Sequence, residues 1–350
     1  MSHRLHLLTP DAQYADDAII ERETAGAGFD FDIFREREAR RLPDEALAAA
    51  DGIVVWHEMA IDAAFVERIP RCRIVVRAGV GFDHIDLAVT GRAGIVVCNT
   101  PDYGTSEVAD HAMALMLALR RALVVYHGEL TADPVGAFVT RFDAGRTPLV
   151  RRVRGTVLGI VGLGRIGTAT ALRAKAFGMR VVAYDPYAPA GVEIAVGVER
   201  VATLEALLAT SDVVSLHCPL TEESRGMIGK AELARMKPDA LLINTARGAI
   251  VDVPALIGAI ERREIAGAGI DVLPVEPPRP DDAIVAAYAN LAGSALDGRL
   301  LLTPHSAWSS PESAADARRL AVETAVLYLR DGRLRNLVNG EFLTHRRWPG

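Results

Sequence analysis

The sequence has little of what would place it in several common protein classes. Its 350 residues include only three cysteines, and no apolar run approaches the length that spans a bilayer. Three cysteines cannot build a disulfide framework, and Cys72, Cys98 and Cys218 lack the spacing of metal ligands. We therefore expect no metal site and a reducing compartment. The first residues are too polar for a secretory signal, so the sequence predicts a cytoplasmic protein without a membrane partner.

Basic residues are also in deficit. Lys and Arg number 39 against 45 Asp and Glu, which gives a net charge of -6 and no basic stripe along the chain. Proteins that bind nucleic acid through their surface carry such a stripe, so nucleic acid is not expected as a partner.

Apolar residues, in contrast, make up 50% of the chain, enough for a large core and more typical of two domains than of one. Short apolar runs predict buried strands, and amphipathic stretches such as 62–69 lie between them. The first runs are residues 5–8, 52–56, 74–77 and 95–98. This alternation indicates an α/β fold with a parallel sheet. Residues 22–41 are dense in both charge signs and favour a solvated helix face or a loop.

The centre of the sequence carries the motif around which the chain is organised. An apolar run at 157–161 enters the pattern Gly162-x-Gly164-x-x-Gly167, and an Ala-rich amphipathic segment follows to about residue 177. Gly162 suits a tight turn, Gly164 lets backbone approach a pyrophosphate, and Gly167 permits close packing of helix on strand. The phosphates would lie at the helix N-terminus. The motif therefore predicts a dinucleotide site, with an ordinary glycine-rich loop as the alternative.

A second predicted strand, 180–184, ends in Asp185. An acid about 20 residues after the glycine motif binds the ribose hydroxyls in dinucleotide-binding folds. Because it would repel a 2′-phosphate, Asp185 predicts NAD rather than NADP.

The loop after strand 74–77 suggests the substrate. Arg77-Ala78-Gly79-Val80-Gly81 places glycines, and so accessible amides, at the carboxyl end of a strand, where ligands bind in open α/β sheets. An ordinary turn is the alternative. A guanidinium beside exposed amides suits a carboxylate, which predicts a small acidic substrate.

A long apolar segment follows. Thr105 or Ser106 can cap a helix that runs to about Arg120, and its apolar surface on nearly all sides predicts burial. His111 within it is expected to be a core or interface histidine. Residues 131–154 lack clean periodicity and predict an irregular arm.

Further strand ends carry candidate polar groups. Predicted strands end before His217-Cys218-Pro219-Leu220-Thr221, before Thr245-Ala246-Arg247-Gly248 and at Asp271, and these ends should line one cofactor cleft. Arg247, Glu276 and His305 form a chemically coherent trio for 2-keto acid reduction. The reaction needs a cation for the substrate, a general acid for its oxygen, and a carboxylate that favours the protonated imidazole. Three unrelated surface residues are the alternative.

These motifs together resemble the D-isomer-specific 2-hydroxyacid dehydrogenase family over nearly the whole chain, and its C-terminal-binding-protein branch in particular. The marks of the resemblance are Arg77–Asp83, Ala171–Gly178, Tyr184–Tyr187, His217-Cys218, Asn244–Gly248 and Pro304–Trp308.

The resemblance implies a role for each site residue. Arg247 would bind substrate, Glu276 would pair with the acid/base His305, Arg77, Gly79, Val80 and Gly81 would hold the carboxylate, and Trp308 would wall the pocket. The residues implied to contact NAD are Thr105, Gly162, Gly164, Arg165, Ile166, Asp185, Cys218, Pro219, Thr221, Thr245, Ala246, Arg247, Asp271 and His305.

The resemblance also implies an architecture. A Rossmann NAD-binding domain, residues 106–305, would be inserted into a flavodoxin-like substrate domain, residues 1–105 and 306–350, with catalysis in the cleft between them. A homodimer through the nucleotide domains is usual in the family. Two features depart from the common pattern: residues 281–298 form a longer segment than in simple dehydrogenases, which could reshape the pocket mouth, and His84 stands where the branch often has Asn.

Three functions fit this sequence. The leading hypothesis is an NAD-dependent dehydrogenase that interconverts a 2-keto acid and a D-2-hydroxy acid. The second is a corepressor-like NAD-sensing scaffold, and the third is a phosphite-type dehydrogenase of the same family.

Overall fold

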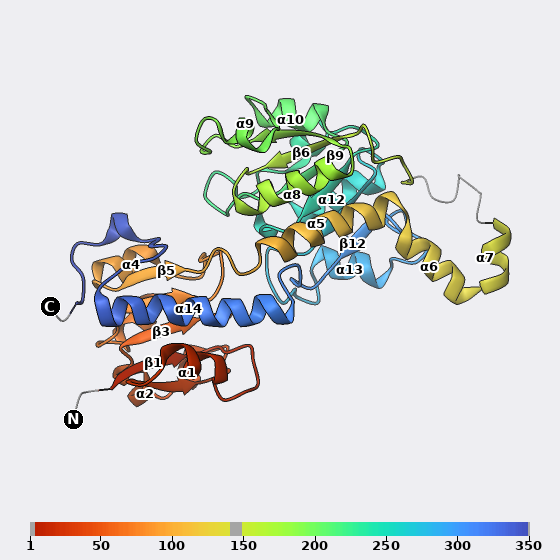
Figure 1. The fold of residues 1–350 in the computed structure, drawn as a ribbon. Coiled ribbons are helices and arrows are strands. Elements are labelled where there is room, and N and C mark those ends of the chain that lie inside the picture. Colours follow the sequence, from red (N-terminus) through yellow and green to blue (C-terminus); the bar gives the residue numbers. More distant parts are fainter. Residues whose placement is uncertain (1–3, 141–148, 349–350) are drawn as a thin grey trace. The chain divides into compact units, whose positions relative to one another are not determined.

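The computed structural model describes residues 4–140 and 149–348 and divides the chain into two compact units. Unit 1 comprises Met1–Gly104 and Ser309–Gly350, and unit 2 comprises Thr105–Trp308. The sequence-based prediction had put the boundaries at residues 105 and 305. Each unit contains one parallel sheet, which agrees with the α/β class expected from the alternating pattern (Figure 1).

The sheet of unit 1 has the strand order β2-β1-β3-β4-β5. This is the flavodoxin-like order 2-1-3-4-5. The strands are β1 (Leu5–Thr9), β2 (Phe29–Ile33), β3 (Gly52–Val55), β4 (Ile74–Arg77) and β5 (Val96–Asn99). Strands β3, β4 and β5 are buried on both faces, as their continuous Val and Ile runs predict.

Helices α3, α4 and α14 of unit 1 begin where a short polar side chain caps them. Asp62 accepts from the Phe65 amide before α3, and Asp86 accepts from the Val89 amide before α4. The helices are α1 (Ile19–Ala25), α2 (Asp44–Ala49), α3 (Ala63–Glu67), α4 (Leu87–Arg92) and α14 (Pro311–Asp331), and α14 packs on α1, β3 and β4.

The prediction for residues 22–41 was wrong in part, because this charged stretch contains the edge strand β2. In Phe29-Asp30-Phe31-Asp32-Ile33 the charges alternate with apolar residues, and β2 pairs in parallel with β1 along its whole length. An edge strand tolerates charge because one side of it meets solvent. The period of two was the missed signal.

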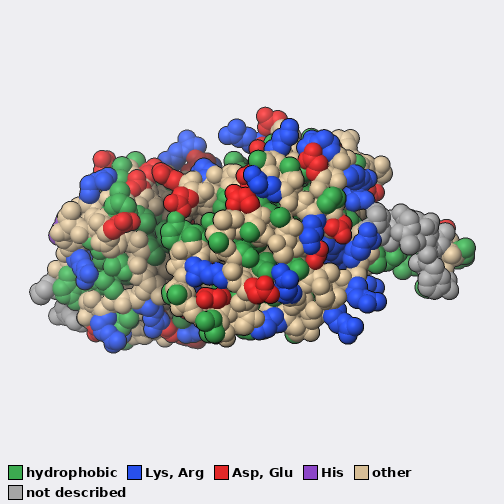
Figure 2. All heavy atoms as spheres, turned by 90° about the horizontal axis from the view of Figure 1, so that it is seen from above, with side chains coloured by type: hydrophobic (Ala, Val, Ile, Leu, Met, Phe, Trp, Pro, Cys, Tyr) green, Lys and Arg blue, Asp and Glu red, His purple; other side chains and the backbone are tan. Residues whose placement is uncertain are grey.

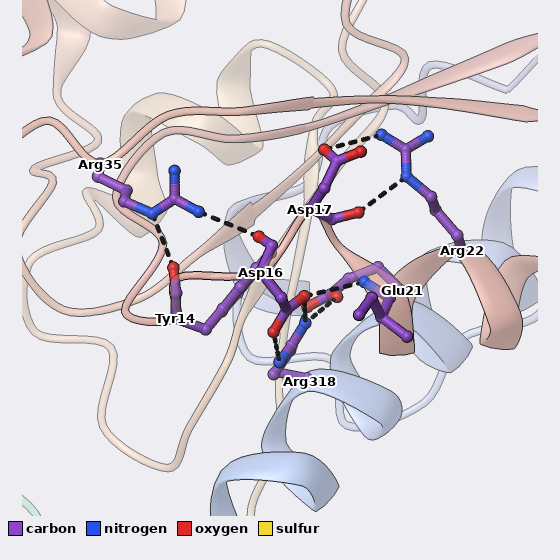
Figure 3. A network of polar contacts seen from close by, with 8 residues as sticks. Tyr14, Asp16, Asp17, Glu21, Arg22, Arg35 and Arg318 are labelled. Atoms are coloured by element: carbon purple, nitrogen blue, oxygen red, sulfur yellow. Dashed lines mark hydrogen bonds and ion pairs between the residues drawn. The ribbon is translucent and has the colours of Figure 1, made fainter.

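A buried ionic network ties the end of unit 1 to its start (Figure 3). Arg318 on α14 donates to both oxygens of Asp16 at 2.7 Å and to Glu21 on α1 at 2.8 and 2.6 Å. The same guanidinium lies 3.7 Å above the Tyr14 ring. Segments some 300 positions apart in sequence are thereby held together.

Unit 2 has the strand order β12-β11-β10-β9-β6-β7-β8, all parallel. Read from β6 as the first strand, this is the Rossmann order 3-2-1-4-5-6 with one strand added beyond the sixth. The strands are β6 (Val157–Val161), β7 (Arg180–Tyr184), β8 (Glu199–Arg200), β9 (Val213–Leu216), β10 (Leu241–Asn244), β11 (Gly267–Ile270) and β12 (Leu300–Leu302). The order reverses between β6 and β9, so this fold puts its ligand crevice at their carboxyl ends.

The helices that cover this sheet bury apolar faces against it, and α5 and α8 pack on each other. The predicted burial of α5 (Thr105–Arg120) is confirmed only for one side: Ala109, Ala112, Met113, Leu115, Met116, Leu119 and Arg120 are buried, whereas Ser106, Asp110 and Ala114 are exposed. The others are α8 (Arg165–Ala176), α9 (Val192–Val196), α10 (Leu204–Thr210), α11 (Lys230–Leu233), α12 (Val253–Glu261) and α13 (Ala283–Ala289), with short 3-10 turns Ala39–Arg41, Gly248–Ile250 and Gly340–Phe342 in the chain. The long segment 281–298 contains α13, and its Ile284 and Leu296 join the core.

The prediction of an irregular arm over 131–154 was wrong for residues 131–132 and 134–140, because α6 (Leu123–Ala132) extends into this range and α7 (Pro134–Thr140) follows it. Pro134 occupies the first turn of α7, where a backbone N–H would have no partner within the helix, so proline is tolerated there. The Asp133 side chain accepts from the amides of Val135 and Gly136. Residues 141–148 lie outside the described part. Helices α6 and α7 extend away from the rest of unit 2 and form an arm (Figure 1). Apolar side chains are visible on this arm (Figure 2).

Within the described ranges 4–140 and 149–348, none of the helices combines the length and the hydrophobicity that crossing a bilayer requires.

Candidate active site

The turn between β6 and α8 has the geometry that a dinucleotide phosphate requires. A Cβ at Gly162 would collide with the backbone of Cys218, so the turns after β6 and β9 touch at the point where the strand order reverses. A Cβ at Gly167 would overlap the Gly162 carbonyl. At Gly164, in contrast, a Cβ would meet no atom of the described residues within 4 Å, apart from its own chain neighbours. The fold therefore requires glycine at positions 162 and 167, whereas Gly164 borders open space.

That open space lies at the N-terminus of α8. Gly164 is the N-cap and supplies no side-chain cap, so the first amides of the helix, including those of Arg165 and Ile166, point toward an uncapped end. Such an end favours an anion. The residues present therefore fit a dinucleotide pyrophosphate.

Asp185 lies beside this turn, at the end of β7. Its Oδ2 accepts from the Leu163 amide at 2.8 Å, and its Oδ1 accepts from the amides of Tyr187 and Ala188 at 2.9 Å. The carboxylate is thus fixed against the phosphate-binding turn. A fixed, half-exposed acid at this place suits the paired hydroxyls of a ribose.

The end of β9 supplies apolar and neutral groups. Burial raises the pKa of the Cys218 thiol to about 11, so it stays protonated, and burial lowers the pKa of His217 to about 3, so this ring stays neutral. Thr221 exchanges hydrogen bonds with Ser224, whose hydroxyl donates to the Pro219 carbonyl at 2.7 Å. The predicted contacts Cys218, Pro219 and Thr221 therefore form one braced turn.

Thr245, just after β10, carries an orphan group. Its side chain is 8% exposed, and its Oγ1 is buried without a hydrogen-bond partner among the described residues. A buried hydroxyl with no partner is unfavourable unless a ligand satisfies it. The next amide, that of Ala246, donates to the Asn244 side chain at 3.0 Å. This arrangement also fits a bound cofactor.

Arg247 and Glu276 come from neighbouring turns. A Cβ at Gly248 would overlap the backbone of Leu273, so the turn after β10 packs directly on the loop after β11. Arg247 donates from Nη1 to the Ala246 carbonyl at 2.8 Å. Glu276 accepts from the Leu273 amide at 2.7 Å.

His305 and Glu276 form the closest charged contact of the predicted trio. The His305 Nδ1 lies 2.6 Å from Glu276 Oε2, and the two side chains are 28% and 31% exposed. With Nδ1 held by the carboxylate, Nε2 is the nitrogen that can exchange a proton with a substrate. Both partners stay accessible, which catalysis requires.

The backbone at His305 is in the left-handed region, with φ of +51°. For a residue other than glycine this conformation is unfavourable, and the surroundings must impose it. Asp271, 2% exposed, does so: its carboxylate accepts from the amides of Ser306 and Ala307, and its carbonyl accepts from the His305 amide at 2.7 Å.

Asp271 thus positions the turn that carries the catalytic candidate, a role that the sequence did not reveal. Thr303 adds to it by donating to Asp271 at 2.5 Å, and the His111 Nε2 lies 2.9 Å from the Thr303 hydroxyl. His111 therefore has a polar partner, as expected of a core histidine. Only the spacing of Asp271 and His305 at two neighbouring strand ends could have suggested the link.

The predicted carboxylate loop belongs to unit 1. A Cβ at Gly79 would overlap the Arg77 guanidinium, which donates to the Ala78 carbonyl and is 6% exposed. Thr100 and Asn99 brace the loop through the carbonyls of Arg77 and Val80. Among the described residues no acceptor is assigned to the amides of Val80 and Gly81. Two such amides beside a buried guanidinium are suited to a carboxylate.

The remaining predicted contacts lie near the limits of unit 2. Thr105 opens α5, and its Oγ1 is buried without a partner in the described part of the chain. Trp308 is half-buried and is the last residue of unit 2. No cluster of three or more candidate ligands for a metal ion occurs in the residues that the structure describes.

Comparison with known proteins agrees with this geometry. Residues 113–307 match the family described as D-isomer specific 2-hydroxyacid dehydrogenase, NAD binding domain. A glyoxylate reductase of Korarchaeum cryptofilum (strain OPF8) is 38% identical over 91% of this chain and 92% of its own length. A glyoxylate reductase of Thermococcus litoralis is 36% identical over 90% and 92%.

Solved structures extend the likeness to both units. The NADPH-dependent glyoxylate/hydroxypyruvate reductase of Sinorhizobium meliloti, in complex with NADP and malonate, matches with a TM-score of 0.79 and 28% identity over 98% of this chain and 99% of that chain. The D-lactate dehydrogenase of Aquifex aeolicus, with NAD and lactic acid, gives 0.77 and 28% over 96% and 99%. The chain therefore belongs to the D-isomer specific 2-hydroxyacid dehydrogenase family and is an NAD(P)-dependent oxidoreductase of 2-keto and 2-hydroxy acids.

Proposed function

We propose that this enzyme reduces a small 2-keto acid, glyoxylate or hydroxypyruvate, to the corresponding 2-hydroxy acid, with His305 as the general acid. The observation that carries the proposal is the 2.6 Å contact between His305 and Glu276 on a turn that Asp271 holds in place. The activities for which the relatives are named support this substrate class.

The residues divide the work by charge. When bound, the nicotinamide supplies the hydride that reaches the carbonyl carbon. The Arg247 guanidinium orients the substrate and stabilises negative charge on its carbonyl oxygen, and His305 gives that oxygen a proton from Nε2. Glu276 favours the protonated ring through its negative charge. In unit 1, Arg77 with the Gly79, Val80 and Gly81 backbone offers a carboxylate subsite, and Trp308 in unit 2 is proposed as a pocket wall.

For the cofactor we propose a preference for NAD(H). The support is Asp185, whose charge would repel a 2′-phosphate and whose orientation three backbone amides fix. Proposed contacts are Gly162, Gly164, Arg165 and Ile166 for the phosphates, with Thr245, Ala246 and Asp271 toward the nicotinamide. Cys218, Pro219, Thr221 and Thr105 complete the proposed set.

The experiment that tests the proposed function is a turnover screen. Purified enzyme is given glyoxylate, hydroxypyruvate or a longer 2-keto acid with NADH or NADPH, and phosphite with NAD. We expect reduction of glyoxylate or hydroxypyruvate to be the fastest. Oxidation of phosphite alone would establish the phosphite-type alternative, and no turnover of any substrate would favour a cofactor-sensing scaffold.

The resemblance to the C-terminal-binding-protein branch stays a prediction from sequence motifs. The Korarchaeum and Thermococcus relatives are named glyoxylate reductases, which supports a metabolic enzyme over a corepressor-like scaffold. The intact trio supports the same choice.

We propose a homodimer in which α6 and α7 contact a second copy of the chain. Apolar side chains on these helices are exposed, among them Val135 at 76%, Phe138 at 60% and Val139 at 78%. A concentration of exposed apolar residues on a protruding arm is typical of an interface. Sedimentation velocity should give a dimer that Val135→Glu with Val139→Glu weakens, whereas Ile194→Glu, at an equally exposed site on α9, should not. A wild-type monomer would contradict the proposal.

A further inference from the structure

An open cavity with basic side chains lies in unit 1, at the amino ends of its parallel strands. It has a volume of about 620 Å³ and is lined by Leu5, Asp51, Pro70, Arg71, Arg73, Arg346, Arg347 and Trp348. Leu5 opens β1, and Asp51 and Arg73 immediately precede β3 and β4. Arg73 precedes β4 and Arg77 ends it, so the cavity lies at the amino ends of the strands and the loop 77–81 at their carboxyl ends. The cavity is therefore separate from the active-site residues described above.

The lining is strongly basic. Four arginines and one carboxylate, that of Asp51, line the cavity. Asp51 lies 3.2 Å from Arg71 and 3.3 Å from Arg73, and it accepts from the His6 amide at 2.9 Å. Within the described residues the Arg346 side chain has no ion pair or hydrogen bond assigned to it. Arg73 is only 8% exposed, so part of this positive charge is inside the protein. Arg71 and Arg346 are exposed, so the excess of positive charge over Asp51 lies at the surface, where it attracts an anion.

Residues 346–348 form one wall of the cavity. Arg347 donates to the carbonyls of Ile69, Pro70 and Cys72 at 3.0–3.2 Å, which fixes residues 346–348 against the sheet edge. The Trp348 ring packs on Tyr328 with centroids 5.3 Å apart. A Cβ at Gly332 would come within 3.3 Å of the indole, so the glycine that ends α14 also leaves room for it.

Tyr328 packs on Trp348 and does not itself line the cavity. Its side chain is 1% exposed, and its hydroxyl is buried without a hydrogen-bond partner in the described ranges. Burial raises the pKa of Tyr328, while Arg346 and Arg73, both lining the cavity, act in the opposite direction. The orphan hydroxyl therefore lies within electrostatic reach of the same arginines.

We propose that this cavity is a binding site for a small anion with at least two negative charges, a phosphate ester or a polycarboxylate. Arginine forks match the oxygens of both groups bidentately. The volume suits a small metabolite. The site involves none of the residues proposed for catalysis, and it does not depend on the proposed function.

The test is isothermal titration calorimetry of the full-length protein saturated with NADH, so that the dinucleotide site is filled. The probes are inorganic phosphate, glycerol 3-phosphate and citrate, which separate phosphate from carboxylate ligands. Arg346→Ala removes one arginine with no assigned partner. Arg92→Ala is the matched control, since Arg92 is exposed in the same unit and does not line the cavity. Arg247→Ala removes the active-site cation.

We expect at least one probe to bind wild-type protein with one-to-one stoichiometry. Arg346→Ala should weaken that binding about tenfold or more, the scale of one lost charge-assisted contact, while Arg92→Ala and Arg247→Ala leave it unchanged. Quenching of Trp fluorescence that Trp348→Phe abolishes would place the ligand in this cavity. Absence of binding by all three probes would overturn the proposal, and so would equal binding by Arg346→Ala or loss of binding in Arg247→Ala.

Discussion

Two regions of this molecule each join a cation to carboxylates, and they differ in how much of the pair is accessible. In unit 1, Arg318 meets Asp16 and Glu21, and the side chains of Arg318 and Glu21 are 8% and 3% exposed. In unit 2, His305 meets Glu276, and those side chains are 28% and 31% exposed. The nitrogen-to-oxygen distance is 2.6 Å both from Arg318 to Glu21 and from His305 to Glu276.

The difference in exposure separates stability from chemistry. The Arg318 cluster joins α14 to α1 and to the loop before α1. The guanidinium donates its hydrogen bonds to the carboxylates of Asp16 and Glu21. The His305 pair lies at a strand end on a left-handed turn, and both of its side chains are accessible. We therefore expect changes in the first region to alter stability and changes in the second to alter turnover.

The largest effect is expected from Arg318→Ala. It leaves the carboxylate of Glu21 buried without its partner, which costs about 3–5 kcal/mol of unfolding free energy. Arg319→Ala is the matched control: this neighbour is 44% exposed and pairs with Asp316 and Glu323, and its loss should cost less than about 1 kcal/mol. Urea unfolding of both variants measures the difference. Equal stabilities would mean that the buried cluster is not what holds α14 to α1.

This stability contribution should depend on pH. The hydrogen bond from Arg318 lowers the pKa of Asp16 from its ordinary 3.8 to about 2. A carboxyl with a lowered folded-state pKa stabilises above its ordinary value and loses that contribution as pH falls through the lowered one. The gap in unfolding free energy between wild type and Arg318→Ala should therefore narrow between about pH 4 and pH 2.

Next in size is the loss of the general acid. His305→Ala should lower kcat about a hundredfold or more, with NADH affinity and melting temperature near wild type. His305→Asn is the companion variant, because asparagine tolerates the left-handed backbone and cannot donate the proton. Steady-state kinetics with fluorescence titration of NADH separates the two effects. A low kcat in Ala with wild-type turnover in Asn would assign the loss to backbone conformation.

A smaller effect is expected at Arg247. Arg247→Lys keeps the charge and loses the bidentate fork, so KM should rise and kcat should fall, together about tenfold or more in kcat/KM. Arg262→Lys, on an exposed pair with Glu264, serves as the control and should change neither parameter. Kinetics at saturating NADH gives both values. Unchanged kinetics in Arg247→Lys would remove Arg247 from the active site.

The smallest effect concerns cofactor choice. Asp185→Ser should shift the ratio of kcat/KM for NADH over NADPH about tenfold toward NADPH, because it removes the charge that repels a 2′-phosphate. Asp185→Asn removes the charge and keeps an acceptor for the Leu163 amide, so it controls for loosening of the turn. Wild-type enzyme that uses NADH and NADPH equally well would contradict the assignment.

Sequence reasoning succeeded where a local pattern reports a local structure. The run 157–161 with its glycines predicted β6, the turn and α8, and the Val and Ile runs predicted the buried strands of unit 1. It failed where charge masked a period of two, as in β2, and where a proline opened a helix, as in α7.

Contacts between distant segments were beyond that reasoning. Asp271 fixes the turn of His305 from a neighbouring strand end, and Arg318 reaches Asp16 across almost the whole chain. The basic cavity joins residues 51, 71 and 73 to residues 346–348. Tertiary packing brings these residues together, and no spacing in the sequence predicts that they are in contact.

The central claim is that Glu276 tunes His305 for proton transfer, and the pH dependence of kcat in Glu276→Gln tests it most directly. Gln keeps a hydrogen-bond acceptor for the ring and removes the charge that favours its protonated form. The account predicts a milder loss of kcat than in His305→Ala and a limit for keto-acid reduction that moves to lower pH. An unchanged limit, with wild-type rates from about pH 5 to pH 9, would contradict it.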